Sequence, residues 1–152
     1  MGKIEEKLNS LGIQLPEPAK PLAAYIPAKQ TGNLVFTAGQ LPLVDGNLTA
    51  TGHLGKDVDV ETAKVAARIC VINALSAVKG VIGDLDKIKQ VVRVVGYVAS
   101  TPEFTQQPAV INGASELLLE IFEDAGRHAR SAVGVAVLPL NAAVEVELTV
   151  EV

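Results

Sequence analysis

The sequence lacks the residues that usually mark a surface for binding nucleic acids. It has no tryptophan, two tyrosines and three phenylalanines, and its 13 lysines and arginines are outnumbered by 17 aspartates and glutamates. The basic residues form no cluster along the chain. Proteins that bind RNA or DNA generally combine basic patches with stacking aromatic side chains. The composition therefore argues against a nucleic-acid partner.

Cysteine and histidine are equally scarce. Cys70 is the only cysteine, which excludes a disulfide within the chain and fits a reducing compartment. The two histidines, His53 and His128, are far apart and have neither a cysteine partner nor the spacing of a zinc-binding helix. The sequence predicts no metal site, and it contains no phosphate-binding loop, so we expect no cofactor.

The chain also lacks a long uninterrupted apolar run. No stretch reaches the ~18 apolar residues that are typical of a membrane-spanning helix. The charged start, Met1–Lys7, is not followed by the apolar core of a signal peptide. We therefore expect a cytoplasmic protein with no membrane partner. With 152 residues, of which 49% are hydrophobic, we expect a single domain over residues 1–152.

Helical and extended patterns alternate along the chain. Residues 1–21 are predicted to form an N-terminal extension with a short helix at 3–11, and the prolines that follow exclude a continuous helix. Further segments are predicted in this order: an extended segment at 23–28, a strand at 33–40 after the turn at 31–33, a polar loop at 50–59, a helix at 61–81, a strand at 88–100, a helix at 108–123, and strands at 131–137 and 144–150.

This order predicts an α+β fold in which two long helices cover one face of a mixed β-sheet. The strands are rich in valine, and they offer apolar side chains on both faces. Two helices cover only one of these faces. We therefore expect an oligomer in which the sheets of different copies pack together.

Arg130, at the start of a strand, and Glu145, on the next strand, are the best candidates for chemistry. An arginine held on a rigid element can bind a carboxylate through two parallel hydrogen bonds. A carboxylate can orient or activate a water molecule. Two structural alternatives stay open: Arg130 can instead pair with Glu145 or Glu147 on the adjacent strand, and Glu145 can belong to a solvated strand face with Glu147 and Glu151.

Three motifs together resemble the Rid (YjgF-type) family of imine and enamine deaminases. The first is Tyr25 followed by Gly-Asn-Leu-Val-Phe-Thr-Ala-Gly-Gln-Leu-Pro at 32–42. The second is Ala-Arg-Ser at 129–131, which leads into Leu-Pro at 138–139. The third is Val-Glu-Val-Glu at 144–147. The resemblance covers residues 22–150, and it implies a chorismate-mutase-like fold, a homotrimer, and active sites in clefts between subunits.

The activity that the resemblance implies is hydrolysis of 2-imino or 2-enamino acids to 2-keto acids and ammonia. Arg130 matches the family's arginine that binds the substrate carboxylate, and Glu145 matches the glutamate that positions the attacking water. Tyr25 matches a tyrosine of the pocket wall. Gly39 matches a glycine that lets the backbone approach the ligand, and Asn112 lies near the family's helix asparagine.

Backbone groups around Ala132 and Gly39 are expected to help hold the imine, and Ser131 is a further substrate-binding candidate. His128 is either a general acid or a ligand contact beside Arg130, or it is a bystander. The chain departs from the family where Ala132 replaces a frequent cysteine, Ala38 replaces a serine, and two alanines at 23–24 replace Gly-Pro. Two other functions stay open. One is non-catalytic binding of a small carboxylate, and the other is the endoribonuclease or translation-inhibitor activity attached to some family members.

Overall fold

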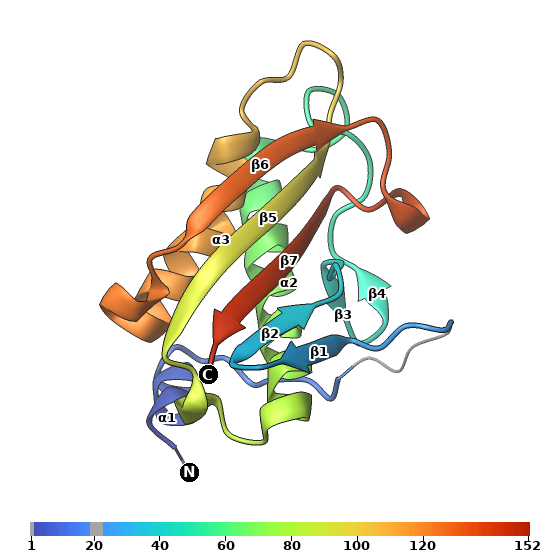
Figure 1. Cartoon of the computed structure of the whole chain (residues 1–152). Helices are drawn as coiled ribbons and strands as arrows, with labels where there is room; N and C mark the ends of the chain where they lie inside the picture. Colours follow the sequence, from blue (N-terminus) through green and yellow to red (C-terminus); the bar gives the residue numbers. More distant parts are fainter. Residues whose placement is uncertain (1, 19–22) are drawn as a thin grey trace.

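A five-stranded mixed β-sheet forms one layer of the protein, and helices pack against one of its faces (Figure 1). The computed structural model describes residues 2–18 and 23–152. In their order across the sheet, the strands are β1 (Ala28–Thr31), β2 (Leu34–Thr37), β7 (Val144–Glu151), β5 (Gln90–Ala99) and β6 (Ala129–Val135). Neighbouring strands are antiparallel except β5 and β6, which are parallel. The mixed sheet of the predicted α+β fold is confirmed.

The two long helices, α2 (Val60–Ile82) and α3 (Gln107–Phe122), lie side by side behind the sheet (Figure 1). Both bounds of each helix agree with the prediction to within one residue. Asp59 caps α2 by accepting a hydrogen bond from the Thr62 amide at 2.8 Å, and Gly83 ends the helix with a φ of 81°. α3 carries the chain between the parallel strands β5 and β6.

α2 is long and apolar enough to cross a membrane by length and composition, with a mean hydropathy of 1.7. Lys64 and Arg68 interrupt this stretch, so it contains no long uninterrupted apolar run. In the structure, 56% of this apolar stretch of α2 is buried inside the protein, where the helix packs against β7 and α3. Such burial is typical of the core helix of a folded domain.

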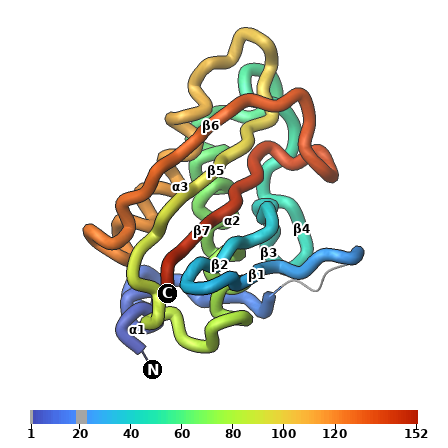
Figure 2. The backbone as a smooth tube through the Cα atoms, viewed as in Figure 1, coloured from blue at the N-terminus to red at the C-terminus, as the bar shows by residue number. Residues whose placement is uncertain are grey.

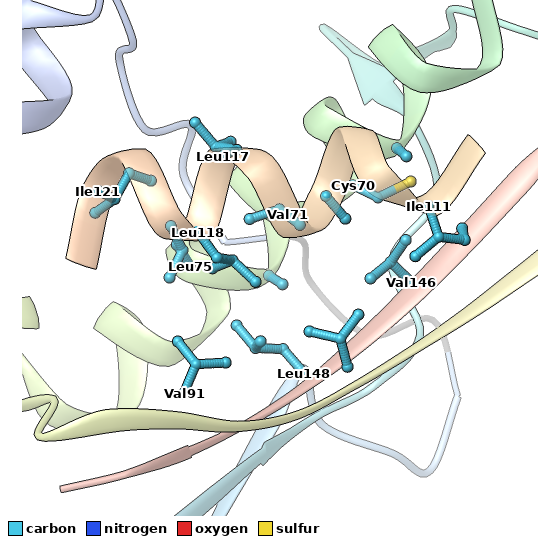
Figure 3. Close-up of a cluster of buried hydrophobic side chains, with 14 of the residues drawn as sticks. Cys70, Val71, Leu75, Val91, Ile111, Leu117, Leu118, Ile121, Val146 and Leu148 are labelled. Carbon is cyan, nitrogen blue, oxygen red and sulfur yellow. The ribbon is translucent and has the colours of Figure 1, made fainter. Parts of the chain in front are cut away.

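The hydrophobic core lies between the two helices and the sheet (Figure 3). Leu75 of α2, Leu118 of α3 and Leu148 of β7 are all at most 1% exposed, and each such side chain contributes roughly 2 kcal/mol of burial free energy. Small residues let the helices approach closely: a Cβ at Gly113 of α3 would overlap the Lys64 carbonyl of α2. Cys70 is buried, and burial raises the pKa of its thiol.

The predicted N-terminal helix is present as α1 (Lys3–Ser10). The amides of Lys3 and Ile4 each donate to the carboxylate of Asp86, at 2.9 Å, so a residue distant in sequence caps the helix. These two hydrogen bonds lower the pKa of Asp86. Residues 19–21, the end of the predicted extension, lie outside the described residues. The assignment of residues 1–152 to one domain stays a prediction.

The extended segment predicted at 23–28 is wrong in position. The strand β1 begins only at Ala28, next to Pro27, whose carbonyl accepts from the Ala38 amide at 2.7 Å, and the residues before Pro27 run away from the sheet (Figure 2). The Gly32–Asn33 turn then joins β1 to β2 in a tight hairpin. A second, unpredicted hairpin pairs β3 (Leu43–Val44) with β4 (Asn47–Leu48).

α3 stops at Phe122, and a short 3-10 turn (Glu123–Gly126) follows it. Two further 3-10 turns lie at Leu85–Lys87 and Pro139–Asn141. Strand β6 begins two residues earlier than predicted, at Ala129, so that Arg130 lies inside the strand.

The face of the sheet opposite the helices is not covered by any helix of the described chain (Figure 1). The four even-numbered residues of β7 between Val144 and Val150 are buried, and the alternate residues from Glu145 to Glu151 point to the other face. The strand register places Tyr97 and Phe36 on this second face as well. Phe36 and Val133 are more than 40% exposed. This open face is the surface from which oligomer formation was expected.

Candidate active site

Arg130 is held by two side chains of α3 at the edge of the sheet. In the register of the parallel pair, Arg130 is opposite Val94, whose side chain is buried on the helix side, so Arg130 also faces the helices. Its Nη1 donates to Asn112 Oδ1 at 2.8 Å and to Ser115 Oγ at 3.2 Å. Asn112 and Ser115 are three residues apart in a helix and therefore lie on the same side of it. The structure brings the predicted residues Arg130 and Asn112 together.

His128 joins the same cluster through Ser115. Its Nδ1 is 2.6 Å from the carbonyl oxygen of Gly126, and its Nε2 is 2.9 Å from Ser115 Oγ. A carbonyl only accepts, so Nδ1 carries a hydrogen, and in the neutral ring Nε2 accepts the Ser115 hydroxyl hydrogen. Ser115 Oγ is then free to accept from Arg130. His128 thus fixes the direction in which the Ser115 hydroxyl points.

Ser115 was missed by sequence reasoning. Its spacing from Asn112 would have been enough to place it on the same helix face. The four residues Arg130, Asn112, Ser115 and His128 are called the arginine cluster below.

Arg130 does not pair with a carboxylate of the described chain, so the alternative of an ion pair with Glu145 or Glu147 is wrong. Both glutamates are on the other face of the sheet, since Glu145 is opposite Tyr97 and Glu147 is opposite Val95. Within the described chain the hydrogen bonds of Arg130 use Nη1 alone, and its Nε and Nη2 edge has no partner there. That edge can form the two parallel hydrogen bonds that bind a carboxylate.

Glu145 lies against the loop that follows β2. A Cβ at Gly39 would overlap the Glu145 carboxylate in its present position, so the glycine leaves room for this side chain as it lies. The loop is anchored to β7 by paired hydrogen bonds between Gln40 and Val146, at 2.8 and 3.0 Å. The Glu145 side chain is about half buried. Burial, followed by the nearby charge of Glu147, raises the pKa of Glu145.

Glu145 and Glu147, two residues apart on β7, differ in their hydrogen-bond partners. The Tyr97 hydroxyl donates to Glu147 Oε1 at 2.6 Å, and this hydrogen bond, with burial, raises the pKa of Tyr97 to about 12. Glu151 accepts from Asn33 and Gln90, both at 3.1 Å. Glu145 has no hydrogen-bond or ion-pair partner in the described chain, so its carboxylate is available to a water or a ligand. This distinction could not be drawn from the alternating sequence.

The remaining predicted site residues lie apart from the arginine cluster. Tyr25 is 56% exposed and belongs to the segment that runs away from the sheet. Ser131 is on the open face, where its hydroxyl accepts from Arg93 Nη2 at 3.1 Å. Ala132, next along β6, points to the helix side and is partly buried against the core. Within one chain, then, the candidates form two groups on opposite faces of the sheet.

No group of three or more histidines, cysteines, aspartates or glutamates suited to a metal ion occurs among the described residues. His53 is far from the arginine cluster in the fold: its Nε2 is 2.6 Å from the carbonyl oxygen of Ala136, beyond the end of β6.

The fold and the arginine cluster define a small α+β protein with an oriented arginine at a sheet edge. Residues 5–152 match the family model described as "YjgF/chorismate_mutase-like, putative endoribonuclease". The chain belongs to this family, the Rid (YjgF-type) proteins.

Relatives along the whole chain agree with this assignment. Protein TCP17 of Trypanosoma cruzi is 44% identical over 99% of this chain and 94% of its own length. The 2-iminobutanoate/2-iminopropanoate deaminase of Dermatophagoides farinae is 31% identical over 89% of this chain and 91% of its own. The crystal structure of the protein Atu1372, of unknown function, from Agrobacterium tumefaciens has a TM-score of 0.92 and 47% identity, covering 99% of this chain and 92% of that one.

Proposed function

We propose that this protein hydrolyses small 2-imino and 2-enamino acids to 2-keto acids and ammonia, at sites that two copies of the chain build together. The observation that carries the proposal is that Arg130 is held in place but has no acidic partner in the described chain. Its guanidinium is positioned by Asn112 and Ser115, but its Nε and Nη2 edge meets no carboxylate of the described chain. An oriented arginine without an acidic partner is suited to bind the carboxylate of a small acid.

The second half of the proposed site is Glu145 with Gly39. Glu145 is half buried, has no partner in the described chain and lies on the face opposite Arg130. A single chain therefore does not present both groups to one ligand. A second copy that packs against the open face and the β6 edge can bring its Glu145 to the first copy's Arg130. We propose that a homotrimer forms in this way, and that the projecting segment with Tyr25 reaches the same cleft.

In the proposed reaction, Arg130 binds the carboxylate and so fixes the C=N carbon. Glu145 takes a proton from a water molecule as the water oxygen bonds to that carbon, and the C=N electron pair moves to the nitrogen. The nitrogen of the resulting carbinolamine, formed from the protonated imine, receives the proton held by Glu145. The C–N bond then breaks to release ammonia, and the hydroxyl proton passes to the Glu145 carboxylate and on to solvent as the C=O bond of the 2-keto acid forms. A raised pKa makes Glu145 a stronger base than an ordinary glutamate, while positioning supplies the rest of the rate gain.

The named activity of the Dermatophagoides farinae relative supports this reaction for the present chain. Ala132 and Ala38 stand where many family members have cysteine and serine, so a cleft that binds small carboxylates without turnover is the second candidate function. Endoribonuclease activity, which the family description names, is disfavoured by the acidic composition. The expected cytoplasmic location stays a prediction.

An assay with imines generated in place tests the proposed reaction. An amino-acid oxidase produces 2-iminopropanoate or 2-iminobutanoate, and the release of ammonia and keto acid is followed with and without the protein. We expect acceleration by the wild type and by Arg127→Ala, a matched control at an exposed arginine. We expect at least about a hundredfold loss in Arg130→Ala. Binding of pyruvate or 2-oxobutanoate without any acceleration would favour the binding function instead.

A mixing experiment tests whether two copies share each site. Arg130→Ala and Glu145→Gln are each expected to be inactive. If equal amounts are unfolded together and refolded as mixed trimers, about one quarter of the sites receive both wild-type groups by chance. Activity should then return to about that fraction. Sites built within one chain would instead stay inactive after mixing, while light scattering reports whether trimers have formed.

A further inference from the structure

The loop between β4 and α2, residues 51–58, forms one wall of a pocket that is separate from the arginine cluster. The loop joins the end of β5 like an extra strand: the Leu54 amide donates to the Ala99 carbonyl at 2.8 Å, and the Thr101 amide donates to the Leu54 carbonyl at 3.0 Å. Leu54 itself is fully buried. The loop is thus fixed to the body of the protein.

The backbone of this loop is also fixed internally. Asp57 accepts from the His53 amide at 2.9 Å, and the His53 carbonyl accepts from the amides of Asp57 and Val58 at 2.8 and 3.1 Å. Gly55 has a φ of 89°, and a Cβ there would overlap the Thr101 hydroxyl. The His53 ring closes the wall, with its Nε2 2.6 Å from the Ala136 carbonyl oxygen.

The pocket has a volume of about 650 Å³, and no acidic residue lines it, although the chain has a net charge of −4. Lys56 lies at its rim and forms no ion pair with the described chain, and the Thr101 side chain makes no hydrogen bond there. Phe104 and Pro102 supply an apolar wall. The Gln107 amide is already committed, since its Nε2 donates to Ser100 Oγ at 3.3 Å and to the Phe104 carbonyl at 2.8 Å.

We propose that this pocket binds a small organic anion, with the carboxylate at Lys56 and Thr101 and the apolar body against Phe104. An unpaired ammonium, a free hydroxyl and a rigid wall are the groups that orient such a ligand. This second site is independent of the proposed imine hydrolysis. Gly134 of β6 lines it, and Gly134 is four residues along the strand from Arg130, which is roughly 13 Å.

Two acidic residues lie near the pocket and set a limit on its affinity. Asp57 Oδ2 is 3.7 Å from His53 Nδ1, and the exposed Glu103 is in the same loop as Pro102. Because Lys56 is also exposed, its attraction for an anion is screened by salt. We expect weak binding that tightens at low ionic strength.

Titration with benzoate, followed by ¹H–¹⁵N NMR, tests the proposal. Benzoate should shift the amide signals of Lys56, Thr101 and Phe104, and it should do so equally in Arg130→Ala, where the arginine site is removed. Benzamide, which has the same shape without the charge, should leave these signals unmoved. Lys56→Gln should weaken benzoate binding about fivefold, whereas Lys89→Gln, at an exposed lysine near the start of β5, should not.

Three outcomes would overturn this second site. Benzoate could cause no shifts around residues 53–56 and 101–107, or its shifts could be confined to the arginine cluster and vanish in Arg130→Ala. Benzamide could also bind as tightly as benzoate, which would make the pocket merely apolar. None of these outcomes bears on the imine assay, so the two proposals fail independently.

Discussion

The carboxylate of Glu145 lies against the backbone of Gly39, in space that a single methyl group would fill. This contact ties the last strand of the sheet to the loop after β2, and it limits the positions that the carboxylate can take. Replacing Gly39 by alanine should push the carboxylate away. We expect turnover of 2-iminopropanoate to fall at least about tenfold, with the affinity for pyruvate at Arg130 nearly unchanged. An equal loss of pyruvate affinity would show instead that Gly39 acts on ligand binding and not on the position of the Glu145 carboxylate.

Asn112 should control substrate affinity through Arg130. Asn112→Ala removes the 2.8 Å hydrogen bond that orients the guanidinium, and a hydrogen bond to a charged group contributes roughly 1.5–3 kcal/mol. We therefore expect KM for the imine to rise at least about tenfold. Steady-state kinetics measure this, with Glu120→Gln on the exposed side of α3 as the control. A fall in kcat at constant KM would contradict the role of Asn112 as a positioning residue.

His128 should act on Arg130 only through Ser115. His128→Ala frees the Ser115 hydroxyl to rotate, and we expect ligand affinity to fall about threefold, since Asn112 still holds the guanidinium. The double variant with Ser115→Ala should bind pyruvate no more weakly than Ser115→Ala alone. Calorimetric titration of the four proteins gives the coupling free energy. Independent, additive losses would place His128 in direct contact with the ligand.

Glu145 should destabilise the folded protein at neutral pH. Its pKa is raised in the folded state, so the protonated form is favoured there, and the stability that protonation provides is lost as the pH rises through the raised pKa. Glu145→Gln should therefore unfold at a higher temperature than the wild type near pH 7.5. The difference should shrink below the ordinary glutamate pKa of 4.5. Thermal unfolding of Glu103→Gln, at an exposed site, is the control for the loss of one charge.

Gly113 should be essential for the packing of α3 on α2. A Cβ at this position overlaps the Lys64 carbonyl, which is backbone and cannot turn away. Gly113→Ala should lower the free energy of unfolding by about 1–3 kcal/mol, despite the better helix propensity of alanine. Urea denaturation measures this. Glu116→Ala, on the surface of the same helix, should change the free energy by less than about 0.5 kcal/mol.

The sequence predicted those elements whose hydrophobic pattern repeats over many residues. α2, α3 and β7 were placed to within one residue because their apolar faces are long and regular. β1 was placed too early: four residues with only Ala28 buried give no alternation, and the hairpin turn at Gly32–Asn33 was the better guide to where the strand ends. The start of β6 was missed because a charged residue, Arg130, lies within an edge strand.

The sequence named residues for a candidate site, but it did not show how the fold divides them between the two faces of the sheet. Arg130 and Glu145 are fifteen positions apart on strands that are consecutive in the chain, which suggests adjacent strands. In the sheet, β5 lies between β6 and β7, and the register turns the two side chains to opposite faces. This arrangement depends on long-range strand order, which no local pattern encodes. Ser115 could have been inferred from its spacing, whereas the free state of Glu145 required the contacts of Tyr97.

Gly113, where α3 contacts α2, lies between Asn112 and Ser115, and these two residues hold Arg130 in place. Any shift or rotation of α3 on the core therefore also moves the side chains that position Arg130. Substitutions that repack the interior near this point will change recognition before they unfold the protein. Residues 112–115 are thus constrained both by the packing of α3 on α2 and by the positioning of Arg130. New ligand specificity is expected to arise instead from the loops on the other side of the proposed cleft.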